Sequence, residues 1–360
     1  MRDTKYVKKI QKLQDSNKYL IDDLISKPLI NFIVPAWKED QVLNKTLTKL
    51  LNLSYTNYRV IINAGGNQET IQIADSFKKY DNFLILKQQA GKGKIRAIND
   101  ALIQIEEGIV FLIDADVQLN DQFLIDMIFP IVNKNEFVVT SHLKPHQSIK
   151  DKDLVKFLYI DRNSKFRKKM ERYIDVVGIN TAMKYEVIKK VTQFTEAKFS
   201  DDNRVIGKDL RSNGCKIYYI ANLIGETYNY PQTISNFIPQ QLRWMENAYY
   251  RRREEGKKFF IIKKILATLI SIYLIIFPFL IFNINLIMIC LYILFFIYLE
   301  KIRKIIFFKK TDAVSLEIKF GLKFYLKLFF YIYLKAILNI LVIIEIIFFK
   351  KRYKKRKNIE

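Results

Sequence analysis

The stretch Phe111–Leu119, FLIDADVQL, begins as an uninterrupted apolar run and ends in two carboxylates one residue apart. A short apolar run of this kind is typical of a buried β-strand. If the strand geometry continues, Asp114 and Asp116 point to the same side. Paired carboxylates at the end of a buried strand are costly unless a cation meets them, and their hard oxygens favour Mg²⁺ or Mn²⁺. The alternative is a solvated turn, because Asp is common in turns.

Apolar runs alternate with amphipathic segments from Pro28 to about Tyr219. This alternation predicts an α/β fold, with a mostly parallel sheet flanked by helices. In such sheets ligands bind beyond the carboxyl ends of the strands, which is where the two aspartates lie. We expect strands over residues 29–35, 58–63, 82–87 and 108–114, and helices over residues 39–53, 69–80 and 94–107.

The character of the chain changes beyond Lys258. Residues 265–282 hold no charge, and a second apolar run covers residues 286–299. Their lengths predict a transmembrane helical hairpin with its turn outside and basic ends inside. A third apolar segment covers residues 331–349, preceded by Lys319, Lys323 and Lys327 on one face of a predicted interfacial helix. If the third segment spans, the basic tail ends outside, against the positive-inside rule; otherwise it is re-entrant or interfacial.

These patterns divide the chain into four parts. We expect a charged N-terminal helix at 1–27, an α/β domain at 28–256, a membrane domain at 257–350 and a basic tail at 351–360. The N-terminus has no apolar core of signal-peptide length, so the first domain is predicted to be cytoplasmic.

The formal net charge is +24, and residues 251–360 carry 23 Lys and Arg against 7 Asp and Glu. Most of the excess therefore flanks the apolar segments, which favours membrane lipids over nucleic acid as the partner. Cys215 and Cys290 have no spacing that indicates a disulfide framework or a zinc site.

Three further segments carry candidate binding residues. Lys94 follows Gly93 at a predicted helix start, where backbone amides favour an anion. Asp202 follows Ser200 and Asp201 at another helix start, and there it is either a functional carboxylate or a helix cap. Gln240, Arg243 and Trp244 share one helix face; an arginine can grip phosphate oxygens, and an indole ring offers a flat apolar face to a sugar.

In their order along the chain, these segments resemble the family-two glycosyltransferases of GT-A fold, particularly the membrane-embedded synthases of cellulose, chitin and hyaluronan. The similarity covers roughly residues 28–250. The matching segments are VPAWKED from Val34, GKIRAIN from Gly93, DAD from Asp114, SDD from Ser200 and QQLRW from Gln240.

The resemblance implies a role for each matching residue. Asp114 contacts the nucleotide diphosphate, Asp116 holds Mn²⁺ or Mg²⁺, and Lys94 faces the donor. Asp202 is the general base. The remaining substrate-binding residues implied by the resemblance are Pro35, Glu39, Gln240, Arg243 and Trp244.

The sequence departs from the family pattern at the end of the second strand. Residues 61–67, IINAGGN, lack the acid that contacts the nucleotide base, so Asn63 or Asn67 is expected to replace that hydrogen bond. A UDP-sugar stays the favoured donor. His142 and His146 flank Pro145, which disrupts a helix, so we expect them in a loop rather than on a metal.

The resulting hypothesis is a multi-pass enzyme of the cell membrane, an inverting hexosyltransferase that extends a polysaccharide. One alternative is the transfer of a single sugar to a lipid-linked acceptor. Another is an inactive membrane scaffold or regulator. The few predicted spans favour a homo-oligomer or a membrane partner.

Overall fold

The computed structural model describes residues 19–89, 93–163, 180–196, 202–254, 284–311 and 320–348, with isolated positions between 256 and 272. The chain forms two compact units. The first comprises residues 1–146 and 169–229 with the last three residues, and the second comprises residues 147–168 and 230–357. The described part of the predicted N-terminal helix holds one 3₁₀ turn, η1 (Ile21–Asp23).

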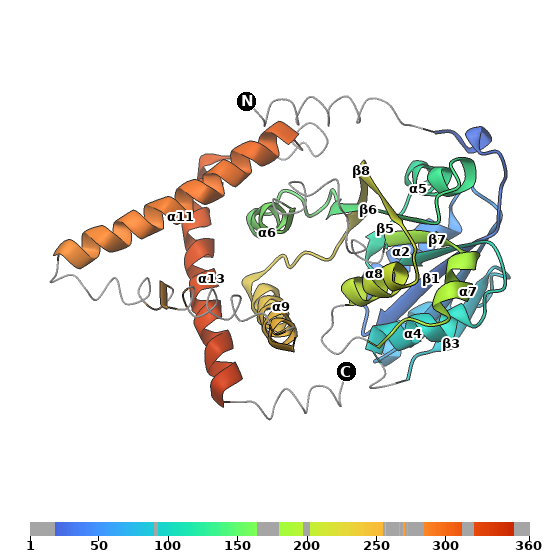
Figure 1. Ribbon diagram of the computed structural model, residues 1–360, viewed down its shortest axis with the longest axis horizontal. Coiled ribbons are helices and arrows are strands. Elements are labelled where there is room, and N and C mark those ends of the chain that lie inside the picture. The colour runs from blue at the N-terminus through green and yellow to red at the C-terminus, as the bar shows by residue number, and fades with distance from the viewer. Residues whose placement is uncertain are drawn as a thin grey trace. The chain divides into compact units, whose positions relative to one another are not determined.

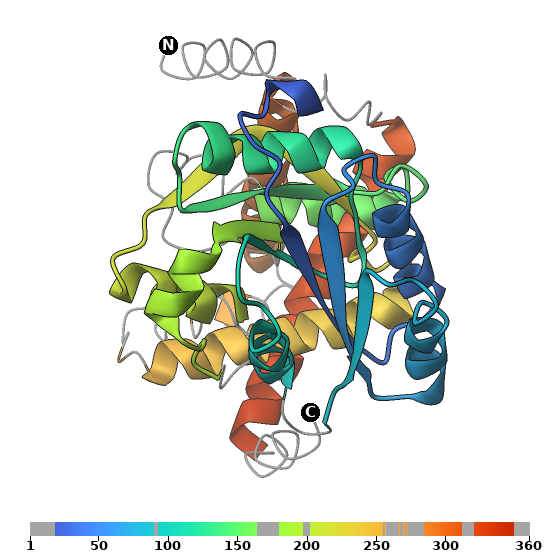
Figure 2. The same cartoon turned by 90° about the vertical axis from the view of Figure 1, so that its right-hand side faces the viewer.

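The first unit is built on an eight-stranded sheet in the order β3-β2-β1-β4-β7-β6-β8-β5. The first four strands of that order are parallel, as predicted, whereas β7 is antiparallel to both of its neighbours and β5 is antiparallel to β8. The sheet is therefore mixed (Figure 2). Its strands are β1 (Ile30–Trp37), β2 (Tyr58–Gly65), β3 (Phe83–Lys87), β4 (Ile109–Ile113), β5 (Val117–Gln118), β6 (Val138–Pro145), β7 (Asn180–Lys184) and β8 (Ile217–Thr227).

Helices cover both faces of this sheet (Figure 1). One hydrophobic cluster joins Phe111 and Ile113 of β4 to α2 (Gln41–Leu51), α3 (Gln68–Asp75) and α5 (Asp121–Asn133). The other joins Val110 and Leu112 to α4 (Gly93–Leu102), α7 (Tyr185–Val191) and α8 (Asp202–Ser212). Alternate side chains of one strand thus enter opposite cores, which explains why the strands read as continuous apolar runs.

The histidines do not share the predicted loop. His142 is buried within β6, and only His146 follows the end of that strand. The pairing of β6 with β7 ends at Thr140, so the missing N–H of Pro145 costs no ladder hydrogen bond, and Pro145 ends β6 instead of disrupting a helix.

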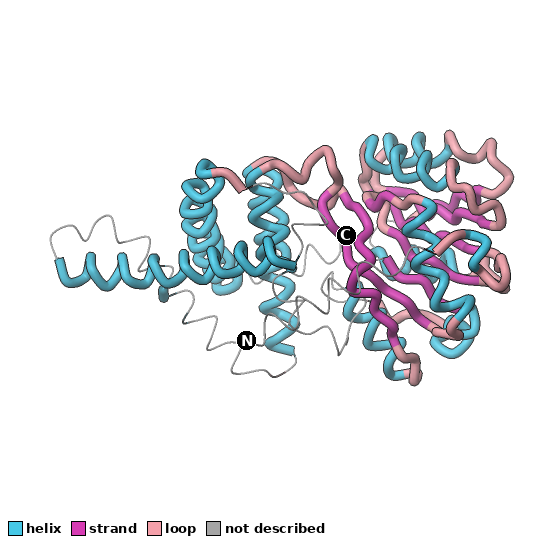
Figure 3. The backbone as a smooth tube through the Cα atoms, turned by 90° about the horizontal axis from the view of Figure 1, so that it is seen from above, coloured by secondary structure: helices cyan, strands magenta, loops and turns pink. Residues whose placement is uncertain are grey.

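The second unit is helical within its described residues (Figure 3). Its helices are α6 (Asp153–Asn163), α9 (Ile234–Glu254), α11 (Ile284–Thr311) and α13 (Leu322–Phe348). The Phe157 ring of α6 packs 5.2 Å from that of Tyr331 in α13, and Lys327 pairs with Asp153 at 2.8 Å. The Tyr298 hydroxyl of α11 donates to the Tyr325 carbonyl of α13 at 3.4 Å.

The apolar segments differ from the prediction in two respects. The expected interfacial helix and the third apolar segment form one continuous helix, α13, and its Lys327 binds Asp153 rather than standing on a separate surface helix. The turn expected at 283–285 is already helical at Ile284 and Asn285. Among the described residues, one stretch, Leu322–Val342, is long and apolar enough to cross a membrane. Residues 265–282 lie almost wholly outside the described residues.

Candidate active site at the carboxyl ends of β1 and β4

The carboxyl ends of β1 and β4 separate from each other. The pairing of β1 with β4 ends at Ile33 and Leu112, whereas its pairing with β2 continues to Trp37 and Gly65. The chain runs from β1 outward through β2 and β3 and returns to β4 on the other side. Such a reversal of strand order opens a crevice in which ligands bind.

Pro35 lies in β1 just beyond the last β1–β4 pair. The Ile30 nitrogen donates to Asn57 at the start of β2, so by alternation odd-numbered residues of β1 present their nitrogens toward β4. The missing N–H of Pro35 therefore costs no ladder hydrogen bond, because β4 no longer runs beside it. The side chain is buried opposite Asn63, and its contact with substrate stays a prediction.

The two aspartates occupy a turn rather than a continued strand. β4 ends at Ile113, and the Val117 nitrogen donates to the Asp114 carbonyl oxygen at 3.1 Å. Asp116 is held at the end of β8: its Oδ1 accepts a hydrogen bond from Thr227 Oγ1 at 3.2 Å, and its carbonyl oxygen accepts from the Tyr228 nitrogen at 2.9 Å. The expectation of continued strand geometry is thus wrong, because the chain must bend here to form β5.

A buried threonine of α2 supports the same turn. Thr46 is 1% exposed, and its Oγ1 donates to the Ala115 carbonyl oxygen at 2.7 Å. Gln118 Nε2 donates to the same hydroxyl at 3.0 Å. The backbone between the two carboxylates is therefore fixed by a side chain that the sequence alone does not single out.

Lys94 lies beside the carboxylates, and its contact with a donor stays a prediction. Its ammonium forms an ion pair with Asp114, and Gly93 before it adopts a positive φ of 72° that favours glycine. Burial lowers the pKa of Lys94, but the charges of Asp114, Asp202 and Asp116 outweigh this effect and hold it above the usual value. Because the charge of Asp202 contributes to the raised pKa of Lys94, this first residue of α8 lies within electrostatic reach of the lysine.

Negative charge exceeds positive charge in this cluster. Burial, followed by repulsion from Asp114, raises the pKa of Asp116 to about 7, although Lys94 and Thr227 oppose the rise. Burial and the charges of Asp116 and Asp114 likewise raise the pKa of Glu39 to about 7. Lys38, which precedes Glu39, has a positive φ of 56°, a strained conformation of the kind that gathers at functional sites.

The carboxylates suit a divalent cation that substrate oxygens complete. Among the described residues, no three His, Cys, Asp or Glu side chains gather into a metal site of their own. Mg²⁺ is typically held by one or two carboxylates together with water and substrate phosphates. Asp116, with Asp114 beside it, fits that donor set, and the raised pKa values of Asp116 and Glu39 record a repulsion that a cation would relieve.

The asparagines proposed for the nucleotide base have structural partners. Asn63 is fully buried, and its Nδ2 donates to the Ala97 carbonyl oxygen at 3.1 Å, which joins β2 to α4. Asn67 caps α3, with its Oδ1 accepting from the Thr70 nitrogen at 3.0 Å. Contact of either residue with a base stays a prediction.

Asn99 is a residue whose role the sequence analysis missed, although it ends the quoted GKIRAIN segment. Its Nδ2 donates to the Phe194 carbonyl oxygen at 2.8 Å, and its Oδ1 accepts from the Phe194 nitrogen at 2.9 Å. The segment that leads toward Asp202 is therefore tied to the helix that carries Lys94.

The remaining predicted residues lie in the second unit. Gln240, Arg243 and Trp244 occupy α9, with Arg243 exposed and the other two half-buried. Their spacing on one helix is confirmed, and their contact with a donor or acceptor stays a prediction. Ser200 and Asp201 lie outside the described residues.

Comparisons with known proteins place this site in a family. A family model described as glycosyltransferase like family 2 matches residues 28–247. Poly-β-1,6-N-acetyl-D-glucosamine synthase from Staphylococcus epidermidis is 25% identical over 227 residues, which cover 61% of this chain and 54% of that protein. A dolichyl-phosphate β-glucosyltransferase from Trichomonas vaginalis is 27% identical over 145 residues, which cover 36% of this chain and 45% of that one. The chain thus spans about half the length of these curated relatives.

A solved structure shares the fold. A mannosyltransferase from Pyrobaculum calidifontis, in complex with GDP-Man and Mn²⁺, matches with a TM-score of 0.53 at 13% identity, covering 96% of this chain and 94% of that chain. This likeness is one of fold alone. The family model matches more than half of this chain and agrees with its α/β mixed sheet. The chain therefore belongs to glycosyltransferase family 2.

Proposed function

We propose that the protein is an inverting glycosyltransferase that moves a sugar from a nucleotide-diphosphate donor to a growing polysaccharide at the cell membrane. The observation that carries the proposal is the cluster of Lys94, Asp114, Asp116 and Glu39 at the crevice between β1 and β4. Its unbalanced negative charge suits a divalent cation, and its lysine suits a diphosphate.

Each residue of the site has a task in this reaction. Asp116 would hold Mn²⁺ or Mg²⁺, which neutralises charge on the leaving diphosphate. Lys94 would bind the diphosphate together with Arg243. Asp202 would accept the proton of the attacking acceptor hydroxyl. Attack opposite the leaving group inverts the anomeric centre.

The proposed acceptor rests on the names of two similar proteins. The S. epidermidis relative, a poly-β-1,6-N-acetyl-D-glucosamine synthase, supports a growing glycan as the acceptor and an N-acetylhexosamine as the transferred sugar. A UDP-sugar stays the favoured donor. The dolichyl-phosphate glucosyltransferase supports the alternative, transfer of one sugar to a lipid-linked acceptor.

Membrane attachment is part of the proposal. The stretch Leu322–Val342 has a mean hydropathy of 1.6, and α11 and α13 expose large apolar side chains such as Met288, Tyr292 and Leu326. Lipid contact would cover these surfaces. We further propose that the chain crosses the membrane several times and keeps its catalytic unit in the cytoplasm. A homo-oligomer or a membrane partner would then complete a path for the polymer.

Release of nucleoside diphosphate tests the proposal. The full chain in nanodiscs is offered UDP- and GDP-sugars with Mn²⁺ or Mg²⁺ and a membrane extract as the source of acceptor. We expect release from one donor, its loss with EDTA, and products whose size tells extension from single transfer. If no donor gives release and calorimetry detects no metal-dependent nucleotide binding, the chain is a membrane scaffold or regulator instead.

A further inference from the structure

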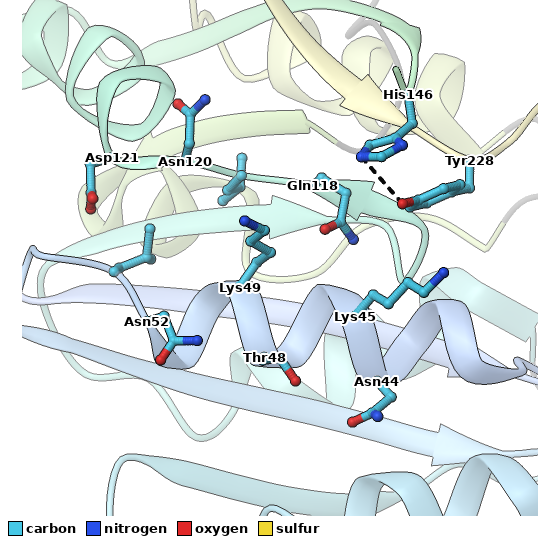
Figure 4. A pocket seen from close by; sticks show the side chains of 12 residues that line it. Asn44, Lys45, Thr48, Lys49, Asn52, Gln118, Asn120, Asp121, His146 and Tyr228 are labelled. Carbon is cyan, nitrogen blue, oxygen red and sulfur yellow. Dashed lines mark hydrogen bonds between the residues drawn. The ribbon is translucent and has the colours of Figure 1, made fainter. Parts of the chain in front are cut away.

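A second cavity lies beside α2, outside the carboxylate cluster (Figure 4). Its volume is about 430 Å³, within the range of small-molecule sites. We call it the α2 groove; the lining residues that the argument uses are Lys45, Lys49, Gln118, Asn120, His146 and Tyr228. None of the carboxylates proposed to bind the donor lines it, so a ligand here would not occupy the donor crevice.

The α2 groove presents unneutralised positive charge. Lys45 and Lys49 lie one turn apart on the exposed face of α2, and neither forms an ion pair with a residue that the structure describes. The Lys45 ammonium lies 5.4 Å from the centroid of the Tyr228 ring. The lining also holds one carboxylate, Asp121, whose two oxygens accept hydrogen bonds from Ser54 at 2.6 and 2.9 Å. These bonds come from neutral groups and do not cancel its charge, but two ammonium groups against one carboxylate still leave the lining with a net positive charge. The groove therefore favours an anion.

Two carboxamides add the means to bind a hydroxyl group. Asn120 uses its Oδ1 to cap α5, accepting from the Phe123 nitrogen at 2.8 Å, which leaves its NH₂ group to donate. Gln118 uses its NH₂ group on Thr46, which leaves its carbonyl oxygen to accept. A sugar hydroxyl both donates and accepts, so it can satisfy both side chains at once.

An aromatic wall closes the end of the groove. The His146 and Tyr228 rings stack with their centroids 4.3 Å apart, and the Tyr228 hydroxyl lies 3.2 Å from His146 Nε2. Burial and the nearby charges of Lys45, Lys49 and Lys144 lower the pKa of His146, against the attraction of Glu226, so the ring is neutral at physiological pH. A flat, uncharged aromatic surface beside two cations suits a sugar ring that carries an anionic group.

We propose that the α2 groove binds a saccharide bearing a phosphate monoester. The near-double charge of a phosphate monoester matches two unpaired ammonium groups, and lysine binds phosphate as a point charge without the geometry that arginine imposes. This site goes beyond the transfer reaction, and nothing in its argument depends on which donor the enzyme uses.

Two hydrogen bonds, one from a backbone nitrogen and one from a side-chain hydroxyl, connect the groove to the turn that carries Asp116. The Tyr228 nitrogen donates to the Asp116 carbonyl oxygen at 2.9 Å. Thr46, next to Lys45 on α2, donates to the Ala115 carbonyl oxygen at 2.7 Å. A ligand that draws α2 and Tyr228 together therefore acts on both anchors of the segment that carries Asp116, so occupancy of the groove is expected to alter metal-dependent donor turnover.

Calorimetry with the full chain in detergent tests the proposal. Glucose 6-phosphate, glucose and inorganic phosphate are titrated separately, and we expect glucose 6-phosphate to bind at least tenfold more tightly than either of the others. The double variant Lys45→Gln/Lys49→Gln should weaken it at least tenfold. The control Lys78→Gln/Lys79→Gln removes the same charge from the end of α3, outside the lining of the groove, and should leave it unchanged.

The location is checked by lysine acetylation and mass spectrometry. Saturating glucose 6-phosphate should protect Lys45 and Lys49 but not Lys78 and Lys79. Equal affinity for glucose or for inorganic phosphate, unchanged affinity in the Lys45/Lys49 variant, or protection elsewhere would each overturn the proposal. Metal-dependent binding of the donor nucleotide is measured on the same variants, and we expect it to persist, so that failure of the groove and failure of the transferase site are told apart.

Discussion

The side chain of Asn99 pairs with the backbone of Phe194 in both directions, at 2.8 and 2.9 Å. It joins the helix of Lys94 to the segment that precedes α8. Asn99→Ala would leave two buried backbone groups without partners, at a cost of about 3 kcal/mol. We expect a Tm lower by about 10 °C in differential scanning fluorimetry, and a kcat that falls more than donor affinity does, since Asp202 loses its support.

A matched control for that change is Asn57→Ala. Asn57 makes a single exposed side-chain bond, to the Lys27 carbonyl oxygen at 2.9 Å. Its loss should cost no more than about 1 kcal/mol. Equal Tm values for the two variants would contradict the role given to Asn99.

Lys94 should be required for donor binding. Lys94→Gln leaves Asp114 without its cation beside Asp116, so the diphosphate meets a more negative site. We expect nucleotide affinity to fall at least tenfold in calorimetry with Mn²⁺ present. Arg96→Gln serves as the control on the same helix, because Arg96 pairs with Asp100 at 2.9 Å on the surface, where such pairs contribute little. An equal loss in both variants would point to helix stability instead.

Substitution of Asp202 by Asn distinguishes the two roles considered for this residue, general base and helix cap. Asn replaces Asp at helix starts with little loss of stability, so Asp202→Asn tests the chemistry with the fold intact. We predict that kcat falls by about 10²–10⁴-fold, with donor affinity and Tm close to those of the wild type. If the Tm falls but the folded protein keeps its specific activity, the role of Asp202 is helix capping.

Thr46, which lies on α2, should position the turn between Asp114 and Asp116. Thr46→Val keeps the shape but leaves the Ala115 carbonyl oxygen and Gln118 without their partner, at a cost of about 1–3 kcal/mol. We expect lower stability and a weaker apparent affinity for Mn²⁺ in the donor reaction. Thr48→Val, on the exposed face of the same helix, should change neither quantity.

Because of Tyr55, the free energy of unfolding should fall as the pH rises in the alkaline range. Burial raises the pKa of Tyr55 to about 12, while its hydroxyl donates to the Pro28 carbonyl oxygen at 2.5 Å. Between pH 10 and 12 the unfolded chain loses this proton and the folded chain keeps it, so stability falls as pH rises. The difference between wild type and Tyr55→Phe in thermal unfolding should therefore shrink or change sign over that interval. A constant difference would show that Tyr55 titrates normally.

The sequence predicted the elements around the carboxylates but not how they are fixed. Continuous apolar runs predicted β1, β2 and β4. A helix start was also predicted at Gly93, where α4 does begin, whereas the ion pair of Lys94 with Asp114 was not predicted. The turn at Asp114 was predicted only as the alternative to a continued strand, because the pairing that fixes it joins Val117 to Thr227, a partner far along the chain. The roles of Thr46 and Asn99 were missed for the same reason, since their partners are backbone groups that no local pattern reveals.

The apolar C-terminal segments show a further limit of local patterns. The basic spacing of Lys323 and Lys327 predicted a separate interfacial helix, yet both belong to α13. Tertiary pairing of Lys327 with Asp153 overrides the amphipathic pattern. Composition predicted that the C-terminal part of the chain is apolar. It did not predict where α13 begins, because that depends on tertiary packing.

The place of β4 between β1 and β7 also dictates an order of events during synthesis. One edge of β4 can pair at once with β1, which has already left the ribosome, but the other must wait for residues 180–184. Until then, five buried apolar residues form an open sheet edge of the kind that templates aggregation. We therefore expect a nascent chain halted between residues 113 and 180 to depend on chaperones, because the strand that leads to Asp114 and Asp116 still exposes one edge.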